Sequence, residues 1–264
     1  MCDKFFSVLG LVCRIPFKVR YTFDLSRADF YLPIIGLFPA GLSAGAYCAV
    51  GDFANPLITA LVMLIVQYAA FNLFHLDGLA DTGDAFLGNF DREKRFAILK
   101  DSRIGVYGLF AVLAVLGLKT ALLQDLLDSA WANPEIFGYP VSGRFAAALI
   151  PGATGPAKPD GLGVLLKGAS PLRAIAGGLL ALGLWNGVSR GILAVFFGNF
   201  FYATTPFMFA LAVSGSALLA ALVSLSIARM YRLRLGGYTG DALGAAVELG
   251  ELAHLAWLYL LARL

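Results

Sequence analysis

Long apolar runs alternate with short polar segments along most of the chain. Seven of these runs are candidates for membrane-spanning helices, because a span needs roughly 20 mostly apolar residues. The fourth run is short for a full crossing. The pattern predicts an all-α protein, a polytopic bundle of about seven transmembrane helices. The runs occupy residues 30–50, 55–75, 104–123, 139–153, 174–198, 205–228 and 242–262.

Basic residues between the runs predict the orientation of the bundle. Lysines and arginines gather before the first run and after the second, fourth and sixth, whereas segments 51–54, 124–138 and 199–204 contain none. Short loops rich in Lys and Arg stay on the cytoplasmic side. The alternation is complete if the N-terminus is cytoplasmic and all seven runs cross. We therefore predict an integral protein of the plasma (inner) membrane.

Composition agrees with this interpretation. Of the 264 residues, 59% are hydrophobic and 14% charged, whereas a soluble domain is nearer half apolar and a quarter charged. The net charge of +3 gives no support to nucleic-acid binding. Neither a disulfide framework nor a zinc site is indicated by the spacing of Cys2, Cys13 and Cys48. With no internal repeat and no second domain, residues 1–264 are predicted to form a single integral-membrane domain.

Two glycines in the first run, Gly41 and Gly45, have a small-xxx-small spacing. Such a spacing allows close packing between membrane helices. It favours packing within one bundle and leaves a homo-oligomer open.

Three aspartates stand in the segment HLDGLADTGDAF (75–86), directly after the second run. Asp77, Asp81 and Asp84 are spaced i, i+4, i+7, so a helix places them on one face. Their carboxylates repel one another, and a bound cation would relieve that repulsion. Mg²⁺ suits such a site, since it takes one or two carboxylates and fills its shell with water and substrate phosphates. The alternative is a solvated acidic helix end, with or without pairing to the basic residues of 92–95.

The segment KDSRIGVYG (100–108) leads into the third run and carries Lys100 and Arg103. Both are predicted on the same cytoplasmic face as the aspartates, and arginine suits bidentate phosphate binding. Gly105 and Gly108 allow close approach of a backbone. The alternative is an ordinary basic flank of a membrane helix.

Carboxylates also enter the last run. Asp241 and Glu248 share a helix face, and Glu251 follows three residues later. Carboxylates within membrane spans are rare and indicate function by default. Arg144 and Arg190, predicted within the fourth and fifth runs, are plausible partners, so structural ion pairs with Glu248 or Glu251 are the alternative.

Three classes of function are compatible with these charges: a Mg²⁺-dependent transferase acting on a diphosphate, an ion-coupled transporter and a structural membrane subunit. A transporter would place its charged residues near the bilayer midplane, flanked by broken helices. The gathering of acidic and basic groups on one predicted face favours the transferase.

Several motifs closely resemble the signatures of the cobalamin synthase family, the adenosylcobinamide-GDP ribazoletransferases. They are HLDGLADTGDAF, DREKRFAILKDSRIGVYG and GGYTGDALGAAVELGEL, supported by RIPF, LPIIGLFPAGL, SGRFAAALI and AKPDGLG. The resemblance covers nearly the whole chain in the expected order. It departs at Lys158, where the family pattern has an arginine, and lysine lacks bidentate geometry.

The resemblance implies that α-ribazole, or its 5′-phosphate, reacts with adenosylcobinamide-GDP to give adenosylcobalamin, or its 5′-phosphate, and GMP. Asp77, Asp81 and Asp84 would hold Mg²⁺ against the diphosphate, and Asp241 would complete the metal site or orient the attacking hydroxyl. The catalytic set is therefore predicted as Asp81, Asp84, Asp241 and Arg103.

Substrate contacts are expected from four residues. Arg103 and Lys100 would steady the charge on the leaving GMP. Glu248 would contact the corrin amides or act behind the site. Arg14 would reach the site only if the N-terminal segment folds back onto the bundle.

Two other enzyme classes place aspartates at the end of a membrane helix. CDP-alcohol-type phosphotransferases of lipid synthesis have an alanine-arginine pair after the first aspartates, which Leu79-Ala80-Asp81 does not supply. Polyprenyl-diphosphate transferases normally carry two matching aspartate-rich motifs, and GYTGDALG is a poor second copy.

Overall fold

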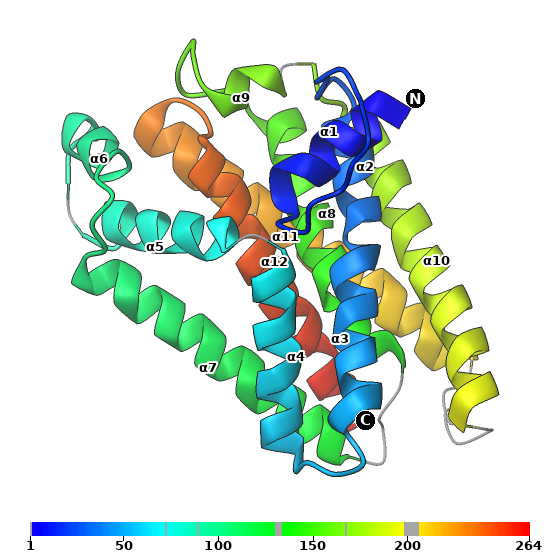
Figure 1. Ribbon diagram of the computed structural model, residues 1–264. Coiled ribbons are helices and arrows are strands. Elements are labelled where there is room, and N and C mark those ends of the chain that lie inside the picture. The colour runs from blue at the N-terminus through cyan, green and yellow to red at the C-terminus, as the bar shows by residue number, and fades with distance from the viewer. Residues whose placement is uncertain (1, 72, 89, 130–133, 167, 198–205) are drawn as a thin grey trace.

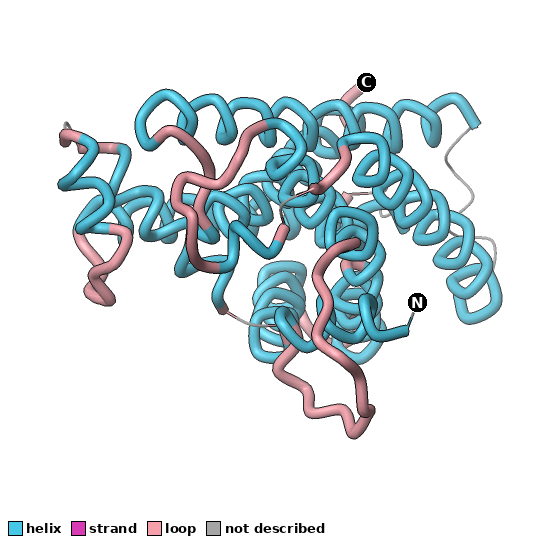
Figure 2. The backbone as a smooth tube through the Cα atoms, turned by 90° about the horizontal axis from the view of Figure 1, so that it is seen from above, coloured by secondary structure: helices cyan, strands magenta, loops and turns pink. Residues whose placement is uncertain are grey.

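The computed structural model describes residues 2–71, 73–88, 90–129, 134–166, 168–197 and 206–264. Within these ranges helices and loops form the whole fold, and no strand is present (Figures 1 and 2). The all-α prediction is confirmed. The helices are α1 (Cys2–Val12), α2 (Ala28–Ile35), α3 (Leu37–Val50), α4 (Pro56–Ala70), α5 (Phe74–Phe86), α6 (Arg92–Ile98), α7 (Val106–Asp128), the 3₁₀ helix η1 (Pro134–Gly138), α8 (Tyr139–Ala153), α9 (Leu162–Leu165), α10 (Pro171–Phe197), α11 (Pro206–Leu235) and α12 (Gly240–Leu261).

Helices occupy all seven predicted runs. By length and hydropathy, four helical stretches can cross a membrane: Ala28–Val50, Val106–Asp128, Pro171–Ser189 and Phe207–Leu235. The apolar helix α4 is shorter, at 15 residues. These four stretches support membrane integration, while crossing by all seven runs and a cytoplasmic N-terminus stay predictions.

The short fourth run forms α8, the central helix of the bundle. Eleven of its 15 residues are buried, and α12 packs along it through glycines. A Cβ on Gly250 would lie 3.0 Å from the Cα of Gly143, and a Cβ on Gly143 would collide with the carbonyl of Val247. Because α8 is enclosed by protein, it does not need the long apolar surface of a lipid-facing helix.

The first run is divided at Gly36 into α2 and α3. Pro33 and Pro39, which lack a backbone N–H, flank the division. At Gly36 the chain approaches α8 so closely that a Cβ would lie 2.7 Å from the Cα of Val141. The interruption therefore fits this run against the central helix.

The N-terminal segment folds back onto the bundle. Cys13 and Phe71 form an isolated antiparallel bridge, and the Arg14 N–H donates to the carbonyl of Ala70 at 2.8 Å. Since Ala70 ends α4, this contact places Arg14 just before α5. The condition for Arg14 to approach the site is met.

Candidate active site

Helix α5 lies crosswise to α4 at one end of the bundle (Figure 1). It crosses α12 where two glycines face each other. A Cβ on Gly78 would lie 2.9 Å from the carbonyl oxygen of Asp241, and a Cβ on Gly244 would lie 3.1 Å from the Cα of Gly78. The glycines let the two backbones meet, which brings the aspartates of α5 beside the first turn of α12.

The acidic site, as we call Asp77, Asp81 and Asp241, lies at this crossing. Asp77 is exposed, while Asp81 and Asp241 are half-buried. Burial, together with the negative charges of Asp241, Asp77 and Asp84, raises the pKa of Asp81 to about 7. Within the described residues, no ion pair involves any of these carboxylates. Negative charge therefore gathers here without an ion pair among the described residues.

Asp84 has a different environment from the acidic site. Its carboxylate accepts hydrogen bonds from the N–H of Gly105 at 2.6 Å and of Gly108 at 2.8 Å. These amides belong to the start of α7, where unpaired N–H groups and the helix dipole favour an anion. A Cβ at either glycine would collide with the carboxylate. The close approach expected from Gly105 and Gly108 is thus made by Asp84, which ties α5 to α7.

The basic residues of 92–95 do not neutralise the aspartates. Arg92 donates to the carbonyl of Leu235 at 3.0 Å, at the end of α11. Arg95 is buried and donates to the carbonyl of Ala85, near the end of α5. Both arginines thus bind helix C-termini, where cations are favoured. The pairing of the aspartates with this run is not formed among the described residues, and a solvated acidic helix end stays the alternative.

Lys100 and Arg103 lie on the loop before α7 and are exposed. The Arg103 side chain is 86% exposed, and its guanidinium pairs with Asp101 at 2.6 Å. Hydrogen bonds from Arg103 lower the pKa of Asp101 to about 2. Arg103 is therefore exposed and paired with Asp101, and among the described residues no ion pair joins it to the acidic site.

A cavity of about 160 Å³ adjoins Asp241. Its walls come from α6, the loop 155–163 and the segment before α12. A pair of hydrogen bonds joins the loop to the segment before α12. Ala157 N–H donates to the Tyr238 carbonyl at 2.8 Å, and Tyr238 N–H to that of Gly155 at 2.9 Å. The lining residues are Phe96, Leu99, Pro156, Lys158, Asp160, Gly161, Gly163, Tyr238, Thr239, Gly240 and Asp241.

Lys158 supplies the positive charge of this cavity. Its ammonium lies over the ring of Phe96, 4.4 Å from the centroid, a cation–π contact. Thr239 donates to the Asp241 carboxylate at 2.9 Å. A cavity that contains one lysine thus borders the acidic site at Asp241. This lysine stands where the family pattern has an arginine.

Glu248 lies deeper in α12 and belongs to a buried ion cluster. The Lys119 ammonium contacts Glu248 at 2.6 Å and Glu251 at 2.7 Å, and Arg144 pairs with Glu251 at 3.4 Å. The Tyr68 hydroxyl donates to Glu248 at 2.6 Å. All four charged side chains are at most 1% exposed. The structure thus separates Glu248 from the other predicted substrate contacts.

The ion-pair alternative is therefore confirmed for Arg144 and Glu251. The partner of Glu248 is Lys119, which the sequence analysis did not single out; a lone lysine inside the apolar run 104–123 was the available signal. The side chain of Arg190 lies outside the described residues.

A metal ion at the acidic site would need ligands of a suitable kind and number. Among the described residues, no group of three or more His, Cys, Asp or Glu side chains is close enough to hold one. Mg²⁺ does not need such a group, because one or two carboxylates suffice when substrate phosphates and water complete its shell. The carboxylates of Asp77, Asp81 and Asp241 form no ion pair within the described residues, and they fit that requirement.

The fold and this site define a class: helical membrane proteins with an acidic site at one end of the bundle. Within that class, a family model described as cobalamin-5-phosphate synthase matches residues 4–259. The chain belongs to this family and is a transferase. No solved structure matches it.

Relatives named adenosylcobinamide-GDP ribazoletransferase align over nearly their full length. That of Leptothrix cholodnii is 34% identical, covering 96% of this chain and 94% of its own. That of Shewanella amazonensis is 32% identical, with 95% and 92% covered. That of Clostridioides difficile is 28% identical, with 98% and 97% covered. The family match decides against a CDP-alcohol-type phosphotransferase and an ion-coupled transporter.

Proposed function

We propose that the protein joins adenosylcobinamide-GDP to α-ribazole or α-ribazole 5′-phosphate. A ribose hydroxyl attacks the cobinamide-side phosphorus, the bond from that phosphorus to the bridging oxygen breaks, and GMP leaves with that oxygen while the hydroxyl proton is released. Adenosylcobalamin or its 5′-phosphate forms. The observation that carries this proposal is an acidic site with no ion pair among the described residues, in a chain whose residues 4–259 match the family model.

Catalysis of phosphoryl transfer depends mainly on positioning and on neutralising charge. We assign Asp77 and Asp81 to hold Mg²⁺, which when bound would neutralise the diphosphate. Asp241, fixed by Thr239, orients the attacking hydroxyl or adds a ligand. Asp84 fixes the start of α7 through two amides and keeps lone pairs that can face the cation.

The cavity beside Asp241 is assigned to the diphosphate end of the substrate. Lys158 offers it a positive charge. Arg103 reaches the leaving GMP after it separates from Asp101, and Lys100 adds positive charge on the same loop. Arg14, which is held near the start of α5, contacts the substrate from that end of the helix. The active site is proposed on the cytoplasmic face of the inner membrane.

The test is GMP release by detergent-purified protein given both substrates, with and without Mg²⁺. Wild type should need Mg²⁺, and Asp81→Asn should lose about a hundredfold or more of its activity. Asp125→Asn is the matched control, because Asp125 is a partly exposed aspartate that pairs with Arg263 at 3.0 Å outside the site. A well-folded wild type without turnover would overturn the reaction. Full activity of Asp81→Asn would move the metal site elsewhere.

A further inference from the structure

A second cavity, of about 550 Å³, combines positive charge with an apolar lining. It lies between α1, α2 and α10, and in Figure 1 these helices stand at the right of the bundle while α5 and α6 stand at the left. None of its residues belongs to the proposed active site. They are Lys4, Arg27, Phe30, Tyr31, Leu172, Arg173 and Ala176.

This cavity stands at the ends of two candidate membrane spans. Arg27 directly precedes the stretch Ala28–Val50, and Arg173 lies in the first turn of Pro171–Ser189. The two helices meet at Gly177, where a Cβ would collide with the carbonyl of Phe30. The cavity therefore opens at the level where two adjacent helices enter the membrane.

The cations of the cavity are only partly compensated. Arg173 is fixed by the buried Asp29, whose carboxylate accepts from Arg173 Nε at 2.9 Å and from the Ser170 N–H at 2.6 Å. Lys4 pairs loosely with Asp24 at 3.6 Å. Arg27 is exposed and forms no ion pair within the described residues. One surplus positive charge thus faces the cavity.

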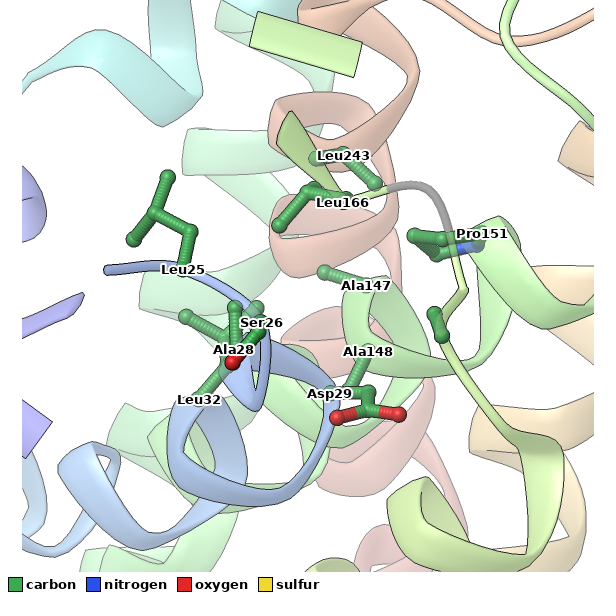
Figure 3. A pocket seen from close by; sticks show the side chains of 11 residues that line it. Leu25, Ser26, Ala28, Asp29, Leu32, Ala147, Ala148, Pro151, Leu166 and Leu243 are labelled. Atoms are coloured by element: carbon green, nitrogen blue, oxygen red, sulfur yellow. The ribbon is translucent and has the colours of Figure 1, made fainter. Parts of the chain in front are cut away.

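The neighbouring cavity behind Asp29 does not compete as a ligand site. It measures about 20 Å³ and is lined by alanines, leucines and Pro151 around Asp29 (Figure 3). A space of that size holds about one water molecule. Asp29 there acts as the fixed anchor for Arg173.

We propose that the cavity binds the headgroup of an anionic phospholipid. Arg27 and Lys4 contact the phosphate, since arginine matches phosphate geometry, and basic pockets between membrane helices bind such headgroups. The acyl chains lie along Tyr31, Phe30 and Leu172, the last of which is 77% exposed. A soluble phosphate would leave this apolar lining uncovered, so the observations favour a lipid.

The test uses the full-length protein, delipidated in a neutral detergent, with dioleoyl-phosphatidylglycerol or dioleoyl-phosphatidylcholine added. Bound lipid is counted by native mass spectrometry, and stability is followed as Tm. Phosphatidylglycerol should bind more tightly and raise Tm more. Arg27→Gln should weaken its binding about fivefold, and Lys4→Gln should act in the same direction.

The matched control is Arg229→Gln, an exposed arginine of α11 that lines none of these cavities; it should bind phosphatidylglycerol as wild type does. Equal binding of the two lipids, or wild-type binding by a folded Arg27→Gln, would overturn the proposal. So would an equal rise in Tm with inorganic phosphate alone, because the cavity would then recognise a free phosphate.

Discussion

Helix α12 carries acidic side chains in two opposite settings. At its first turn Asp241 faces Asp77 and Asp81, and no cation of the described residues pairs with them. Seven residues further on, Glu248 meets Lys119 at 2.6 Å inside the bundle. The first group is partly open to solvent, whereas the second is closed on every side.

The difference follows from the cost of burying charge. An unpaired ion inside a protein is strongly unfavourable, so Glu248 and Glu251 persist only because Lys119 and Arg144 balance them. Near the surface, water weakens the repulsion among the carboxylates of Asp77, Asp81 and Asp241, so the cluster is stable without a bound cation. Charges that pair with an opposite charge hold helices together, whereas charges without such a partner can bind a ligand.

Removing a cation from the buried ion cluster should have the largest effect on stability. Lys119→Met leaves Glu248 and Glu251 with Arg144 alone, and should lower the free energy of unfolding by about 3–5 kcal/mol. The measurement is unfolding in mixed micelles with increasing denaturing detergent. The double variant Lys119→Met/Glu248→Gln restores equal numbers of opposite charges, so it should recover much of the loss. A single variant as stable as wild type would contradict the structural role of the cluster.

The crossing that creates the acidic site should be the next most sensitive feature. Gly78→Ala places a methyl group 2.9 Å from the carbonyl oxygen of Asp241, so α5 and α12 must separate. We expect a loss of about 1–3 kcal/mol in stability, together with lower activity. Gly45→Ala is the matched control, because nothing lies within 4 Å of its Cβ and alanine favours a helix. Unchanged activity in Gly78→Ala would show that the crossing does not set the site.

The helical fold could be predicted because a long apolar run indicates a helix that is removed from water, either inside the protein or in lipid. Their bounds agree with the helices at 106–128, 139–153 and 171–197 to within a few residues. The pattern does not distinguish a helix facing lipid from one enclosed by protein. The buried helix α8 and the break at Gly36 depend on contacts between distant segments, which no local pattern contains.

The site was predictable where residues share one helix. The spacing of Asp77 and Asp81 placed them together on α5, and the family motif added Asp241. The sequence did not indicate that Asp84 would bind the start of α7, because its partners are backbone amides. Nor did it indicate that Arg103 would turn to its neighbour Asp101, since rotamers depend on local geometry.

Asp84 offers a sharper comparison within the aspartate motif. Asp84→Asn keeps the shape but loses a charge-assisted acceptor for two amides, and should cost about 1–2 kcal/mol of stability, as for lost helix caps. Asp81→Asn should instead relieve repulsion and leave the stability unchanged or higher. Thermal unfolding of the two metal-free variants would compare them. Equal destabilisation would mean that Asp81, too, is structural.

The smallest effect is expected at the exposed pair of Asp101 and Arg103. In the structure the Arg103 guanidinium pairs with the Asp101 carboxylate at 2.6 Å. A substrate phosphate must therefore compete with that carboxylate for Arg103. Exposed ion pairs are weak, and Asp101→Asn should lower the KM for adenosylcobinamide-GDP only about twofold, with kcat and stability unchanged. Arg103→Gln should raise the KM, and the double variant should show no gain over it. A higher KM in Asp101→Asn would reverse the interpretation, because Asp101 would then orient Arg103 toward the substrate and not withhold it.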